Sequence, residues 1–119
     1  MSALTVAETL RAAADLIEPE GAWTQGSYWK GADGDCYNNG YPDGALPLCW
    51  CALGALGEVG KVDPADLDPR RVSVTDKAYK ALVYTIGEAN VVGWNDSRNR
   101  TQSQVVAAFR AAADASEAL

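Results

Sequence analysis

Apolar residues recur at helical spacing in four segments of the chain, and the flanking residues indicate where each helix begins or ends. The first predicted helix covers residues 6–17. Thr5 and Glu8 have the spacing of a capping box at its start, and Pro19 follows its end. Its apolar face consists of Val6, Leu10, Ala13 and Ile17.

The second predicted helix is unusually rich in small residues. It opens near Pro47 or Leu48 and closes at Gly60, with Gly54 and Gly57 inside it. Small side chains let another backbone approach closely, and their weak helix propensity means that packing must hold the helix. We therefore expect a buried central helix whose inner face is formed by Cys51, Ala52, Ala55, Leu56 and Val59.

Two further helices are predicted in the second half of the chain. One begins at Ser73, has Asp76 near its positive end and continues to about Glu88. The other follows Thr101 as N-cap, with Gln104 completing a capping box, and ends near residue 115. Their apolar stripes are Tyr79, Leu82, Val83 and Ile86, and Val105, Ala108, Phe109 and Ala112. The predicted fold class is mainly α: a single-domain bundle of about four helices over residues 1–119.

A long loop over residues 22–45 separates the first two helices. Glycine, Asp and Asn are dense in it, and a loop of this length is either functional or contains a short β-hairpin, one strand of which would be residues 23–29. Aromatic residues between adaptable polar ones are typical of binding loops. We predict as partner contacts Tyr28, Trp29, Tyr37 and Tyr41; the alternative is a lid packed by its own side chains.

Composition and charge exclude several classes of function. The net charge is −6 and no basic stripe occurs, which argues against a nucleic-acid partner. Histidine is absent, and with it the commonest general base and metal ligand. No run of eighteen apolar residues could span a membrane, and charges interrupt any signal peptide in the first twenty residues. We expect a cytoplasmic protein with no metal, no cofactor and no membrane partner.

The three cysteines are the first candidates for a chemical site in the sequence. Cys36, Cys49 and Cys51 make an odd number, which favours a reducing compartment, with a Cys36–Cys49 disulfide as the alternative. Cys49 and Cys51 lie at the predicted start of the second helix, where the helix dipole lowers a thiol pKa. The spacing is not that of a thioredoxin motif, and no histidine can activate a thiol. We therefore expect structural cysteines, with a reactive thiol as the alternative.

The triplet Trp94-Asn95-Asp96 predicts a corner between helices. In this interpretation Trp94 fills the core, while Asn95 or Asp96 caps backbone amides. The alternative is a polar pocket formed by Cys49, Cys51, Trp94, Asn95, Asp96 and Arg100.

Three blocks of sequence, taken together, resemble a known family. The chain is similar to a family of small proteins of unknown function from actinobacteria and their phages. The resemblance implies no activity, cofactor or catalytic residue, but it implies a phage origin and, with it, a host protein as partner. The blocks are residues 12–17 leading to 21–26 (AAADLI and GAWTQG), residues 49–55 (CWCALGA), and Trp94-Asn95-Asp96 with Arg100-Thr101.

These observations favour a small interaction protein that binds another protein without catalysis. The alternative is a small enzyme or ligand-binding protein that uses the Cys49, Cys51 and Asp96 pocket. An acidic DNA mimic is disfavoured because the acidic residues are dispersed along the chain.

Overall fold

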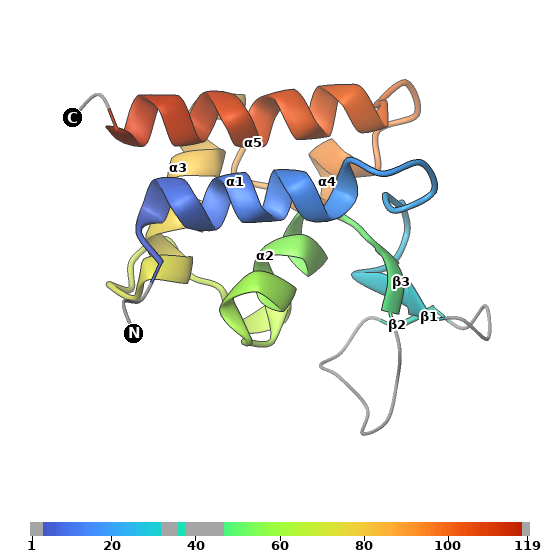
Figure 1. Cartoon of the computed structure of the whole chain (residues 1–119), viewed down its shortest axis with the longest axis horizontal. Coiled ribbons are helices and arrows are strands. Elements are labelled where there is room, and N and C mark those ends of the chain that lie inside the picture. The colour runs from blue at the N-terminus through green and yellow to red at the C-terminus, as the bar shows by residue number, and fades with distance from the viewer. Residues whose placement is uncertain (1–3, 32–35, 38–46, 118–119) are drawn as a thin grey trace.

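The chain folds into a mainly helical structure (Figure 1), and in chain order a small sheet comes between the first two helices. The computed structural model describes residues 4–31, 36–37 and 47–117. The predicted fold class is confirmed. In chain order the elements are α1 (Val6–Ile17), β1 (Trp29–Gly31), β2 (Cys36–Tyr37), β3 (Pro47–Trp50), α2 (Ala52–Gly60), the 3-10 turn η1 (Pro64–Asp66), α3 (Val74–Ile86), α4 (Val91–Asn95) and α5 (Gln102–Glu117).

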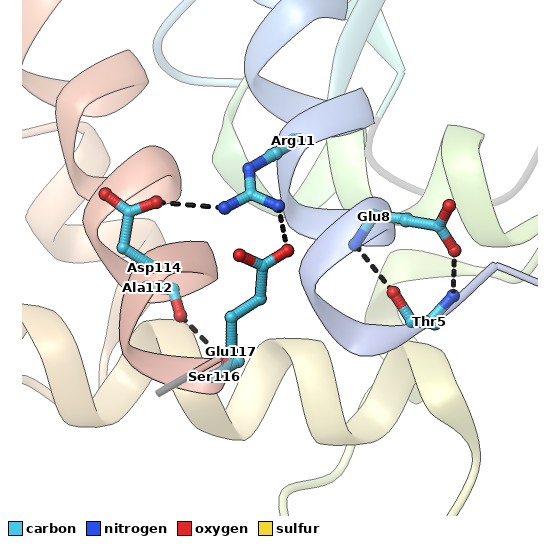
Figure 2. A network of polar contacts seen from close by, with 7 residues as sticks. All are labelled: Thr5, Glu8, Arg11, Ala112, Asp114, Ser116 and Glu117. Atoms are coloured by element: carbon cyan, nitrogen blue, oxygen red, sulfur yellow. Dashed lines mark hydrogen bonds and ion pairs between the residues drawn. The ribbon is translucent and has the colours of Figure 1, made fainter. Parts of the chain in front are cut away.

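Helices α1 and α5 lie side by side and run in opposite directions (Figure 1). At one end Arg11 of α1 pairs with Asp114 and Glu117 of α5 (Figure 2). At the other end Arg110 pairs with Asp15 and Glu18. Exposed ion pairs of this kind contribute little, so burial of the apolar interface supplies most of the stability. Its fully buried side chains include Leu10, Ala13, Ala14, Ile17, Val105, Phe109, Ala112 and Ala113.

The predicted helix caps are present. The Glu8 amide donates to Thr5 Oγ1 at 3.1 Å, and the Thr5 amide donates to Glu8 Oε1 at 2.9 Å, which completes the capping box of α1 (Figure 2). Ser73 caps α3 by accepting from the Asp76 amide at 3.1 Å. The same reciprocal bonds join Thr101 and Gln104 at the start of α5. Each predicted boundary that rests on a cap is therefore confirmed.

Helix α2 begins later than the sequence predicts. Residues Pro47–Trp50 form strand β3, and the helix begins at Ala52 with Cys51 as its N-cap. The backbone amides of Trp50 and Cys51 donate to the carbonyls of Ala22 (2.9 Å) and Tyr28 (3.0 Å). Pairing with the preceding segment therefore satisfies these amides and holds the chain extended until Cys51.

The expected close approach to α2 is confirmed at Gly54. A Cβ atom at this position would lie 1.8 Å from the carbonyl oxygen of Tyr28. Because that oxygen also accepts from the Cys51 amide, the backbone of Tyr28 is held against the first turn of α2. Only glycine leaves room for this contact. Helix α2 contacts α1, α3 and α4, as a central helix should.

The small sheet has the order β2-β1-β3, and both pairings are antiparallel. Lys30 of β1 is paired with Cys36 on one side and with Cys49 on the other. The two cysteines are thus separated by two strand spacings, about 10 Å between Cα atoms. A disulfide requires less than about 7 Å, so the Cys36–Cys49 alternative is wrong. The predicted strand over 23–29 is also misplaced, since it reaches β1 only at Trp29, while Trp23 makes an isolated bridge to Trp50.

Two smaller differences concern the second half of the chain. Helix α3 ends two residues before the predicted Glu88, because Gly87 adopts a left-handed conformation (φ 69°) and terminates it. The short helix α4 was not expected, since five residues are too few to show a periodic pattern. Among the described residues, no helix is long and apolar enough to cross a membrane.

Candidate functional site

The most polar part of the interior is a junction around Asn95, at the end of α4. Its side chain is fully buried. Asn95 Oδ1 accepts from the Trp23 indole at 2.8 Å and from the Ala52 amide at 3.0 Å. Its Nδ2 donates to the Thr24 carbonyl at 3.1 Å and to Asp96 Oδ1 at 3.0 Å. The amide makes all four of its hydrogen bonds, and because an indole and a backbone amide can only donate, the orientation of its oxygen is determined.

Neighbouring residues extend the Asn95 junction to the loop before the sheet. Asp96 Oδ1 accepts from the Gly26 amide at 3.0 Å. The Gln25 side chain donates to the carbonyls of Asn95 (2.9 Å) and Ser97 (3.0 Å). The junction thus connects the segment after α1, the start of α2 and the end of α4, which are distant from one another in the chain. It is the corner that the sequence predicts, and it joins three segments rather than two.

The predicted corner differs in one detail, because Asn95 is fully buried, whereas Trp94 packs against the core without being enclosed by it. Trp94 is only partly buried, and the Arg100 guanidinium lies 4.2 Å from the centre of its ring. Arg100 Nε also donates to the Trp94 carbonyl at 2.9 Å. The guanidinium is therefore engaged by an aromatic face and a backbone carbonyl, a cation–π arrangement that stabilises the corner.

Cys51 is the thiol nearest to the junction, and its chemistry is that of a buried group. Its Sγ accepts from the Gly54 amide at 3.4 Å, as the N-cap of α2. Burial raises the pKa of the Cys51 thiol to about 11, in spite of the helix N-terminus. The thiol is thus protonated at neutral pH and is a poor nucleophile. Cys49, expected at the helix start, lies in β3 and is partly buried.

The residues of the alternative pocket lie in different places, with Cys49 in strand β3. Asn95 and Asp96 belong to the junction, and Cys51 is the residue before Ala52, whose amide donates to Asn95. Trp94 and Arg100 instead line a surface cleft of about 410 Å³, together with Glu88, Asn90, Gly93 and Ser97. Neither cysteine lines this cleft. The six residues therefore do not converge on one cavity.

Of the four predicted loop contacts, the structure describes the exposure of two, Tyr28 and Trp29. Trp29 is 1% exposed and lies in the core, because β1 is the central strand and this side chain faces the helices. It is therefore not a surface anchor. Tyr28 is partly buried, and burial raises its pKa. Tyr37 lies opposite Trp29 in the register of β2, whereas Tyr41 lies outside the described residues.

Sequence reasoning missed a surface groove at the opposite end of the molecule. It has a volume of about 610 Å³ and lies between α3 and α5, beside the first residue of α1. Tyr84 of α3 is 85% exposed at this groove. The available signal was an aromatic residue outside the apolar stripe of its helix. The lining consists of Val6, Lys77, Lys80, Ala81, Tyr84, Thr85, Ala112, Ala115 and Ser116.

The chain is therefore a small, mainly helical protein. The polar groups of its Asn95 junction form hydrogen bonds with one another. The chain belongs to the Family of unknown function (DUF6197), whose model matches residues 1–115. No curated protein and no solved structure is significantly similar to it.

Proposed function

We propose that this protein acts by binding another protein and that the groove between α3 and α5 is its contact surface. The observation that carries the proposal is Tyr84, a tyrosine left 85% exposed beside an apolar groove. Exposed apolar patches of this kind mark interaction surfaces, and tyrosine is among the residues that contribute most to interface energy.

The side chains that could take part in catalysis have structural roles, and this supports a binding function. The Asn95 amide and the Asp96 carboxylate both accept hydrogen bonds from backbone amides within the structure. The Cys51 thiol is buried and protonated at neutral pH. These side chains stabilise the fold, which leaves the surface as the place where function is exerted.

A second contact region is proposed on the sheet side, where the sequence predicts binding by Tyr28, Tyr37 and Tyr41. Trp50 supports this choice. Its indole Nε1 is buried and has no hydrogen-bond partner among the residues that the structure describes. An unsatisfied buried donor costs free energy, and a partner that supplied an acceptor there would recover it.

The experiment is affinity capture with the tagged protein and its Tyr84→Ala variant, followed by mass spectrometry. An actinobacterial lysate is the appropriate source, because the sequence resembles proteins of actinobacteria and their phages, and the proposed partner is a cytoplasmic host protein. Val72→Ala is the matched control, since Val72 is 80% exposed just before α3 but does not line the groove.

We expect at least one protein to be captured by the wild type and by Val72→Ala, and to be lost with Tyr84→Ala. A triple variant with alanine at Tyr28, Tyr37 and Tyr41 tests the sheet side in the same way. Capture that is unchanged by Tyr84→Ala would overturn the assignment of the groove.

A further inference from the structure

The groove between α3 and α5 combines an apolar floor with two lysines. Ala81 of α3 and Ala115 of α5 are small and Ala112 is fully buried beneath the groove, so the side chains lining the groove leave a depression instead of filling it. The lining residues of α3 run from Lys77 to Thr85, which corresponds to about 12 Å along the helix axis. That length matches roughly two turns of a second helix lying in the groove.

The charge at the groove is positive, although the chain as a whole carries −6. Lys77 and Lys80 are both exposed, one turn apart on α3. Within residues 4–31, 36–37 and 47–117, neither ammonium group has an ion-pair or hydrogen-bond partner. Their aliphatic stems can lie along the apolar floor while the ammonium groups remain available to a ligand.

Three acidic residues are direct chain neighbours of residues that line the groove, and each of them has another partner. Asp114 and Glu117 are on another face of α5 and pair with Arg11 of α1 (Figure 2). Asp76 is buried on α3 and accepts from the Ser73 hydroxyl and the Asp68 amide. None of the three lines the groove.

One further polar group on the groove wall, the Ser116 hydroxyl, is already satisfied. The Ser116 hydroxyl donates to the Ala112 carbonyl within α5 at 2.8 Å (Figure 2). The two ammonium groups are therefore the charged donors that a ligand would meet, and they lie beside apolar surface. The complement of this arrangement is a helix with an apolar stripe and carboxylates along its edge.

We propose that the groove binds an amphipathic helical segment of a partner protein, with apolar residues at i, i+3 or i+4 and i+7 and with Asp or Glu facing Lys77 and Lys80. This inference rests on the proposed function and specifies the chemistry of the partner. Tyr84 packs on the apolar stripe, and the lysines select for acidic segments and speed their association.

The test is a selection of displayed random 16-residue peptides on the immobilised full-length protein. Binding of the enriched peptides is then measured by fluorescence anisotropy at low and high salt. Three variants are compared with the wild type: Tyr84→Ala, the double reversal Lys77→Glu with Lys80→Glu, and a control reversal at Lys61 and Arg98. The control changes the net charge equally at exposed positions outside the groove.

We expect enriched peptides to be acidic and to show apolar helical spacing. Their affinity should fall at least roughly tenfold for the lysine reversal and remain within about threefold for the control, with the difference shrinking at high salt. Peptides that require Tyr84 but are neutral or basic would contradict the proposed acidic partner, and so would peptides whose affinity is unchanged by the lysine reversal. In both cases the groove would remain the binding surface. If no enriched peptide depends on Tyr84, the groove assignment fails as well.

Discussion

The Asn95 junction and the groove at Tyr84 occupy opposite ends of the molecule and have opposite properties. At the junction the residue types resemble those of an active site, with Asn, Asp, Cys and Trp in contact or nearby, yet the Asn95 amide is saturated by internal hydrogen bonds. At the groove most of the residues are alanine, lysine and tyrosine, and the charged groups are unpaired among the described residues. Polar or reactive side chains therefore indicate a functional site only where their hydrogen-bonding groups are not already used within the fold.

The largest expected effect is at Asn95. Asn95→Ala removes a hydrogen bond from four groups. The Asp96 carboxylate keeps its bond from the Gly26 amide, whereas the Trp23 indole, the Ala52 amide and the Thr24 carbonyl lose the partner described above. Each unsatisfied buried group costs about 1–3 kcal/mol, so we expect the free energy of unfolding to fall by about 4 kcal/mol in urea denaturation. A loss below about 1 kcal/mol would show that the junction does not hold the three segments together.

The next effect concerns the close contact at Gly54. Helix propensity alone predicts that Gly54→Ala stabilises the protein by about 1 kcal/mol. The added methyl group would, however, meet the Tyr28 carbonyl at 1.8 Å, and this oxygen belongs to the backbone. We expect a destabilisation of about 2–3 kcal/mol, measured by thermal and urea unfolding. The sign of the change in the free energy of unfolding shows whether helix propensity or the backbone contact dominates at this position.

A comparable but pH-dependent effect is expected at Cys51. Its pKa is about 11 in the folded protein, against an ordinary value of 9.0, so the folded state holds the proton more tightly. The contribution to stability is complete below about pH 9 and is lost as the pH rises towards 11. The difference amounts to about 2–3 kcal/mol.

Cys51→Ser is the matched control for this pH dependence, because serine keeps the capping function without a titrating thiol. All other side chains are the same in both proteins, so the informative quantity is the difference between their free energies of unfolding from pH 8 to 11. Parallel curves would contradict the burial account of Cys51. In the native state at neutral pH, a thiol reagent should modify Cys51 far more slowly than in urea.

The smallest effect on stability is expected at the groove. Tyr84→Ala and the double reversal of Lys77 and Lys80 alter exposed side chains without internal partners among the described residues. We expect the free energy of unfolding to change by less than about 0.5 kcal/mol in each case. A loss above about 1.5 kcal/mol would mean that these side chains support the fold.

The sequence predicts those parts of the structure that depend on neighbouring residues. The caps at Thr5, Ser73 and Thr101 involve hydrogen bonds between residues three apart, so their patterns can be read directly. The strand Pro47–Trp50 could not be read in this way, because its extended form depends on pairing with β1, about twenty residues earlier. A short apolar segment before a helix can be either the first turn of that helix or a separate strand, and the sequence alone does not distinguish the two until the paired strand is known.

The candidate sites follow the same distinction. Trp29 looks like a loop anchor in the sequence, and only its place in the central strand of the sheet buries it. Tyr84 lies outside the apolar stripe of its helix, which indicates an exposed side chain, but only the packing of α3 against α5 places it beside a groove. Both outcomes depend on contacts between distant segments, which no local pattern contains.

The central claim is that the junction maintains the fold while the groove carries the function. It is tested most directly by comparing capture of a partner by Tyr84→Ala and by Asp96→Ala, with the unfolding of each variant measured in parallel. We predict that Tyr84→Ala loses the partner at unchanged stability, whereas Asp96→Ala keeps the partner and loses about 1 kcal/mol of stability. Loss of the partner with Asp96→Ala at unchanged stability, together with full capture by Tyr84→Ala, would contradict the account.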